Sequence, residues 1–116
     1  MPTYRTFIPQ QVQASTTETG AGTSEKEFSS KTAKTIEAWI EVGAVSGNGD
    51  FDFNLQTSID GINFTTVASL SNVNATGTFA IVINRADSPT GVISRVTWTK
   101  NSGTNLTFSI IMGRME

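Results

Sequence analysis

The segment from Phe51 to Leu70, FDFNLQTSIDGINFTTVASL, constrains the fold more than any other part of this chain. Apolar and polar residues alternate on both sides of the pair Asp60-Gly61. Alternation sends successive side chains to opposite faces of a β-strand, and Asp-Gly is the strongest short-range signal for a hairpin turn. The segment therefore predicts two antiparallel strands joined by a tight connection.

Two constructions of this turn are open. Asp60-Gly61 can form a two-residue loop of type I′ between Ile59 and Ile62. Alternatively, residues 58–61 form a type I turn whose glycine takes the left-handed position and creates a bulge. We favour the second construction, because serine and aspartate suit its early positions.

The same alternation recurs along most of the chain, between turns rich in Gly, Asn and Ser. We expect a clear strand at 35–45, with Ile36 and Ile40 on one face and Trp39 on the other. The continuous apolar run at 79–83 predicts a strand that is buried centrally. Further strands are expected at 51–57, 63–70, 93–100 and 106–112. The expected fold is all-β, an antiparallel β-sandwich of jelly-roll or immunoglobulin-like type with 6–8 strands.

The N-terminal third is less regular. Residues 1–11 contain Pro2 and Pro9, which argue for an extended N-terminal arm, and the arm carries the apolar residues Tyr4, Phe7 and Ile8. This arm packs either on its own domain or on a neighbouring subunit. Residues 12–116 form the single β-sandwich domain, with a weak edge strand at 12–19. Within it, residues 20–34 are predicted to be a mobile loop with a short strand near Phe28.

Composition excludes several classes of function. The chain has 116 residues, no cysteine and no histidine, and a formal charge of −2. A single domain of this size buries its core without disulfides. The acidic balance gives no footprint for nucleic acid, and no apolar stretch approaches the roughly 18 residues of a membrane-spanning helix.

The carboxylates are too widely spaced to suggest catalysis. Glu37 and Glu41 lie on one strand face about 13 Å apart, whereas glycosidase carboxylates lie roughly 5–9.5 Å apart. Asp60 is explained by the turn, and Asp87 by local pairing with Arg85. We predict that the protein is not an enzyme, has no catalytic residues and needs no cofactor.

Asn48, Asp50 and Asp52 alternate where a loop becomes a strand and offer oxygen ligands for calcium. The EF-hand pattern is absent, and turn chemistry accounts equally well for these residues. We therefore predict no metal site.

Trp39 is the sharpest candidate for binding. The alternation places it between Glu37 and Glu41, on the face opposite Ile36 and Ile40. An exposed tryptophan there can anchor a protein interface, where tryptophan is enriched, or stack on a sugar. The alternative is that the arm or the long loop covers it as a second layer of core. Trp98 shares its parity with Val96 and is assigned to the core.

The hairpin at 56–70, QTSIDGINFTTVASL, resembles a Q-T-S-x-D-G-x-x-[FW]-x-x-V-A-S pattern in small β-sandwich structural proteins of tailed bacteriophages. The later segments FAIVINR and SRVTWTKNSGTNLTFSIIMG resemble the closing strands of the same modules. The resemblance spans residues 36–113. It departs at Ile59, where such hairpins often carry proline, and at Phe64, where many carry tryptophan.

The resemblance implies a non-catalytic virion protein assembled in the host cytoplasm, most simply a capsid decoration or head-stabilising protein. Its partners would be the major capsid protein or other virion proteins, and it would bind as a homo-oligomer, with a trimer favoured. The candidate contacts are the arm residues and the Trp39 face, namely Tyr4, Phe7, Ile8, Glu37, Trp39 and Glu41. The rival interpretations are a carbohydrate-binding module and an oligomerisation domain of a tail or baseplate.

Overall fold

The computed structural model describes residues 7–30, 33–84 and 91–115. These residues form nine β-strands and no helix, so the described part of the chain holds no helix able to cross a membrane. The strands are β1 Phe7–Glu18, β2 Gly22–Thr23, β3 Phe28–Ser29, β4 Thr35–Ser46, β5 Asp50–Ser58, β6 Thr65–Val73, β7 Gly77–Asn84, β8 Ile93–Ser102 and β9 Asn105–Met115.

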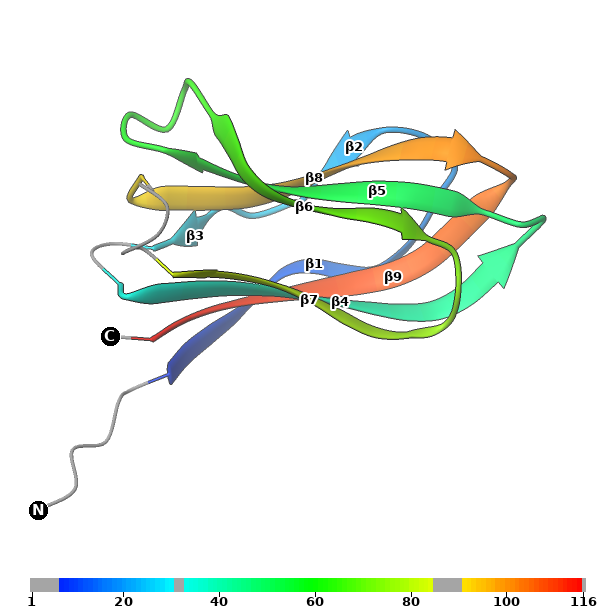
Figure 1. Cartoon of the computed structure of the whole chain (residues 1–116), viewed down its shortest axis with the longest axis horizontal. Helices are drawn as coiled ribbons and strands as arrows, with labels where there is room; N and C mark the ends of the chain where they lie inside the picture. The colour runs from blue at the N-terminus through cyan, green and yellow to red at the C-terminus, as the bar shows by residue number, and fades with distance from the viewer. Residues whose placement is uncertain (1–6, 31–32, 85–90, 116) are drawn as a thin grey trace, which may run out of the picture.

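The strands form two antiparallel sheets that pack face to face, as the two layers of Figure 1 show. The first sheet has the order β1-β9-β4-β7. The second has the order β2-β8-β5-β6, and β3 also pairs with β8. The expected antiparallel sandwich is confirmed. Nine strands replace the six to eight expected, because the two-residue strand β2 adds one that periodicity cannot detect.

The core lies between the two sheets. Side chains alternate along each strand, so every second residue points into this space. Ile36, Ala38, Ile40 and Val42 of β4 are buried, as the sequence predicted. The same parity also placed Ala44 in the core, but Ala44 is exposed and Val45 packs against the core instead, because the pairing with β9 shifts register between Val42 and Ala44. Phe108 of β9 lies at the centre, with its ring centroid 5.0 Å from those of both Phe53 and Trp98 in edge-to-face geometry. Burial of one such side chain stabilises the fold by roughly 1.5–3 kcal/mol. Trp98 is only 1% exposed, so its assignment to the core is confirmed.

The segment at 20–30 connects the two layers. Its backbone N–H groups at Ser24 and Ser30 donate to the carbonyls of Val96 and Val92, beside the short pairings of β2 and β3 with β8. The ring of Phe28 is fully buried. The short strand expected near Phe28 is therefore present, and this part of the expected loop lies along the edge of the second sheet.

One strand was assigned to the wrong environment. The apolar run at 79–83 predicted a central buried strand, but β7 is the last strand of the first sheet and pairs only with β4 among the described elements. Ile81 and Ile83 are buried, whereas Ala80 is exposed and Val82 is 57% exposed. The run is continuous because apolar residues occupy both faces, one towards the core and one towards the outside.

The connection between β5 and β6 is longer than either construction of the turn, because β5 ends at Ser58 and β6 begins at Thr65. The two-residue loop is therefore wrong. Gly61 does take a left-handed φ of 76°, as the second construction required. Ser58 Oγ accepts hydrogen bonds from the N–H groups of Asp60 and Gly61, and this fixes the start of the loop.

Candidate functional site

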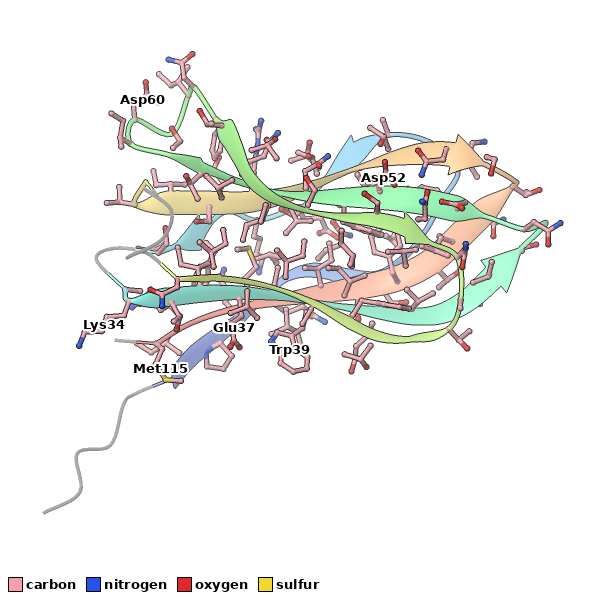
Figure 2. All side chains as sticks on the ribbon, in the orientation of Figure 1. Lys34, Glu37, Trp39, Asp52, Asp60 and Met115 are labelled. Carbon is pink, nitrogen blue, oxygen red and sulfur yellow. The ribbon has the colours of Figure 1, made fainter. Side chains whose placement is uncertain are left out.

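Trp39 lies on the outer face of the first sheet, in the inner strand β4. Its side chain is 42% exposed, and its Nε1–H donates a hydrogen bond of 3.0 Å to Glu37 Oε2. Figure 2 shows the Trp39 and Glu37 side chains together on the side of this sheet that faces away from the second sheet. The bond favours one orientation of the indole, which reduces the ordering that a ligand on its exposed face would require.

Apolar residues of the neighbouring strands extend this surface. Trp39 is directly opposite Ile111 of β9 and Ala80 of β7. Val82, two residues beyond Ala80, is directly opposite Glu37. Residues directly opposite in an antiparallel sheet share a face. We call Trp39, Ala80, Val82 and Ile111 the Trp39 patch.

The part of the Trp39 patch formed by β4 and β9 is hollowed and bordered by negative charge. A shallow depression of about 370 Å³ is lined by Glu37, Trp39, Glu41 and Ile111. The two carboxylates are in register positions on either side of the indole, each two residues from it along β4. A ligand that fits here combines an apolar group over the indole with hydrogen-bond donors or positive charge towards the carboxylates.

The described part of the long loop, residues 20–30 and 33–34, does not cover Trp39. This part pairs with β8 in the opposite sheet, so that version of the covered-tryptophan alternative is wrong. The version in which the arm covers Trp39 concerns residues 1–6, including Tyr4, and lies outside the described residues.

The structure separates Ile8 from the Trp39 patch. The backbone of Phe7 begins β1 opposite Met115. Ile8 is opposite Arg114, whose side chain is buried and lies over the ring of Phe28 in the second sheet. Ile8 therefore points towards the interior and is half-buried, so it is not part of the outer surface.

The residues considered for calcium occupy a different place. Asn101 Nδ2 donates to Asp50 Oδ1 at 3.0 Å and to Asp52 Oδ1 at 2.7 Å, and the backbone N–H of Asn72 donates to Asp52 Oδ1 at 2.8 Å. The two bonds to Asp52, that of the Asn72 backbone foremost and then that of Asn101, lower the pKa of Asp52. Asn48 lies in the turn between β4 and β5, with a φ of 58°.

The amide donors tie β5, β6 and β8 together at one end of the second sheet. Within the described ranges, no three Asp or Glu side chains are grouped closely enough to hold a metal ion. The arrangement is therefore a set of hydrogen bonds that connects the three strands.

Sequence reasoning found Trp39, Glu37 and Glu41 but missed Ala80, Val82 and Ile111. The position of Trp39 in the alternation predicted on which face of the sheet its side chain lies. Its neighbours across the sheet depend on strand order, which no local pattern encodes.

The sequence matches no protein-family model, and comparison with curated proteins finds no match. Among solved structures, the chain is similar to a protein of Bacillus endospore appendages, which are described as disulfide-linked pili. The two are 13% identical with a TM-score of 0.52, over 97% of this chain and 90% of the other. This similarity supports the fold alone.

Proposed function

We propose that this protein is a non-catalytic structural component of a tailed-bacteriophage virion, a decoration or head-stabilising protein that attaches to a repeating protein surface. The Trp39 patch is the single observation that carries the proposal. The resemblance of the hairpin at 56–70 supplies the virion context, with the major capsid protein as the partner and the host cytoplasm as the place of assembly.

The Trp39 patch has the properties of a protein-binding hot spot. Tryptophan is among the residues most enriched in such spots, where it contributes most when it is rigid and surrounded by groups that exclude water. The bond to Glu37 favours one orientation of the indole, and Ile111 on the adjacent strand widens the apolar area. Glu37 and Glu41 favour a partner surface that carries lysine or arginine around an apolar contact.

The similarity to a pilus protein adds nothing to this proposal beyond the sandwich fold. This chain contains no cysteine, so any assembly that it forms is not linked by disulfides.

The test is co-sedimentation of the purified protein with mature phage heads that lack it. We expect the wild-type protein to pellet with heads and Trp39→Ala to remain in the supernatant, since truncation of a hot-spot residue costs at least about 2 kcal/mol. Ile62→Ala is the matched control, because Ile62 is an exposed apolar residue in the distant β5–β6 loop, 80% exposed. Equal pelleting of Trp39→Ala and wild type would refute the role of the Trp39 patch.

A deletion tests the role of the arm. Because Phe7 and Ile8 belong to β1, the arm is best tested by removal of residues 1–6 alone, which leaves the pairing with β9 complete. Loss of pelleting would assign capsid contacts to the arm, and unchanged pelleting would refute that role.

Carbohydrate binding is the second candidate, and the exposed indole beside two carboxylates favours it. Because Trp98 is buried, a change in tryptophan fluorescence on addition of oligosaccharides would come from Trp39. Saturable quenching that disappears in Trp39→Ala would support a sugar ligand and displace the virion proposal.

A further inference from the structure

The sandwich has four sheet edges, and three of them carry features that prevent pairing with another chain. An exposed strand edge presents unpaired N–H and C=O groups, and native proteins blunt such edges with bulges, proline, charge or very short strands. The edge of the second sheet beyond β8 is formed by β2 and β3, of two residues each.

The edge strand β1 is blunted by proline and by bulges. Pro9 removes one backbone donor. The pairing with β9 shifts twice, between Gln11 and Gln13 and between Gln13 and Thr16, and each shift places one extra residue in β1. Such bulges bend an edge strand and interrupt its regular row of hydrogen-bonding groups.

The edge strand β6 is blunted in the same way. Its pairing with β5 shifts between Phe51 and Phe53 and between Leu55 and Gln56, and the extra residues fall in β6. Asn72, near the end of β6, takes a φ of 57° that departs from extended geometry.

The edge strand β7 has no bulge, no proline and no charge, and only its first residue, Gly77, has a positive φ, of 137°. It pairs with β4 over eight consecutive residues, from Gly77 to Asn84, without any shift in register. Its sequence, GTFAIVIN, contains no proline and no charged residue. Regular, apolar, uncharged edges are the ones that recruit another strand.

We propose that β7 pairs with β7 of a second copy of this chain, in antiparallel orientation about a two-fold axis. The first sheet then becomes a continuous layer of eight strands. This inference concerns self-association and holds whether or not the proposed function is correct.

A second copy fits this edge because the strand is complementary to itself. Outward residues must face outward residues across the axis, so the permitted registers are centred on Ala80 or on Ile81. With Ala80 at the axis, Thr78 faces Val82. Every facing pair is then neutral, so self-pairing avoids the repulsion that like charges cause when directly opposite.

The nearest carboxylates of the outer face do not oppose this pairing. Glu37 and Glu41 lie on β4, so those of the two copies are three strand spacings apart, about 14 Å. That separation exceeds the Debye length of about 8 Å at physiological ionic strength. Val82 of each copy would be covered in part by the other, and the two Trp39 patches would lie on one continuous face.

The first experiment measures the mass of the full-length protein by light scattering and sedimentation over a range of concentrations. We expect a dimer of about 25 kDa, twice the chain mass of 12.4 kDa. Ala80→Lys places like charges at the axis and should weaken association at least about tenfold. Gln11→Lys is the matched control, because Gln11 is exposed on the opposite edge strand and should leave the dimer unchanged.

A monomer at every concentration would overturn the proposal. So would a trimer, or a dimer that Ala80→Lys leaves intact. Circular dichroism tests whether Ala80→Lys keeps the fold. If this variant does not fold, the cross-linking experiment below tests the proposal.

The second experiment uses the absence of cysteine from the chain. Directly opposite residues have Cα atoms about 4.5–5.5 Å apart, within the range that a disulfide spans. In the register centred on Ala80, the Ala80→Cys protein alone should form a covalent dimer on mild oxidation. In the register centred on Ile81, where Ala80 faces Val82, a mixture of the Ala80→Cys and Val82→Cys proteins should form it. Gln11→Cys should not. Equal cross-linking of Gln11→Cys, or none by the β7 variants, would overturn pairing through β7.

Discussion

Asp60 organises the loop between β5 and β6 through hydrogen bonds that its ionised form accepts. Oδ1 accepts from the backbone N–H groups of Ile62 and Asn63, both at 2.8 Å, and Oδ2 accepts from Asn63 Nδ2 at 3.0 Å. These bonds, that of the Asn63 backbone foremost, lower the pKa of Asp60 well below its usual 3.8. A carboxyl group with a lowered folded-state pKa stabilises the fold fully above its unfolded pKa, and this contribution is lost as the pH falls.

We therefore expect the free energy of unfolding to decline below about pH 4, and to decline less in Asp60→Asn. The asparagine keeps an acceptor oxygen but does not titrate. Urea unfolding of both proteins between about pH 5 and pH 2 measures the difference. Asp52, whose pKa is also lowered, still titrates in the variant, so part of the pH dependence should remain. Identical pH dependence would show that Asp60 contributes nothing.

The two tryptophans show what residue-level reasoning can reach. Parity alone placed Trp98 with Val96 in the core, and this is confirmed. Parity also placed Trp39 on the outer face, but it could not say whether another segment covers that face. The answer required the position of the long loop, which is fixed by pairing with β8, a strand far along the chain.

At the scale of elements, hairpin turns depend on a few glycines. Gly103, in the turn between β8 and β9, has a left-handed φ of 78°, and a Cβ atom there would lie 2.1 Å from the Asn48 carbonyl oxygen. We expect Gly103→Ala to lower the free energy of unfolding by about 1–3 kcal/mol. In Gly43→Ala the new methyl meets nothing within 4 Å, so a change within about 0.5 kcal/mol is expected. Chemical denaturation compares the two, and equal losses would contradict the role of backbone strain.

The assignment of β7 failed for an identifiable physical reason. A continuous apolar run predicts a strand buried on both faces only if no exposed face of the sheet is itself apolar. Ala80 and Val82 lie beside Trp39 on the outer face, where they form part of an exposed apolar surface. The run therefore encodes a surface as well as a core, and its period cannot separate the two.

At the scale of the whole molecule, the alternation predicted most strands and the sandwich class, but not the strand order. Order depends on pairings between distant segments, of which β1 with β9 is the most distant. Each short local pattern is compatible with many such pairings. Of the Trp39 patch, only the residue in β4 could be predicted. Ile111 and Val82 lie beside it because β9 and β7 are the neighbours of β4 in the sheet.

The pairing of the first and last strands makes the fold depend on both ends of the chain. β9 lies between β1 and β4, and β1 contributes the buried side chain of Val12, whose carbonyl accepts the N–H of Lys26. Removal of residues 1–18 would uncover one edge of β9 and open the core at Val12. Loss of that side chain alone costs on the order of 1–3 kcal/mol, to which the lost strand pairing adds.

We therefore expect deletion of residues 1–18 to abolish the cooperative unfolding transition, because the loss is a large part of the 5–15 kcal/mol that typically stabilises a domain. Deletion of residues 1–6 should change the free energy of unfolding by less than about 0.5 kcal/mol, since every described contact of β1 remains. Thermal unfolding followed by circular dichroism and by tryptophan fluorescence distinguishes the two deletions. A sharp transition after the longer deletion would mean that β4, β7 and β9 form a stable layer without β1.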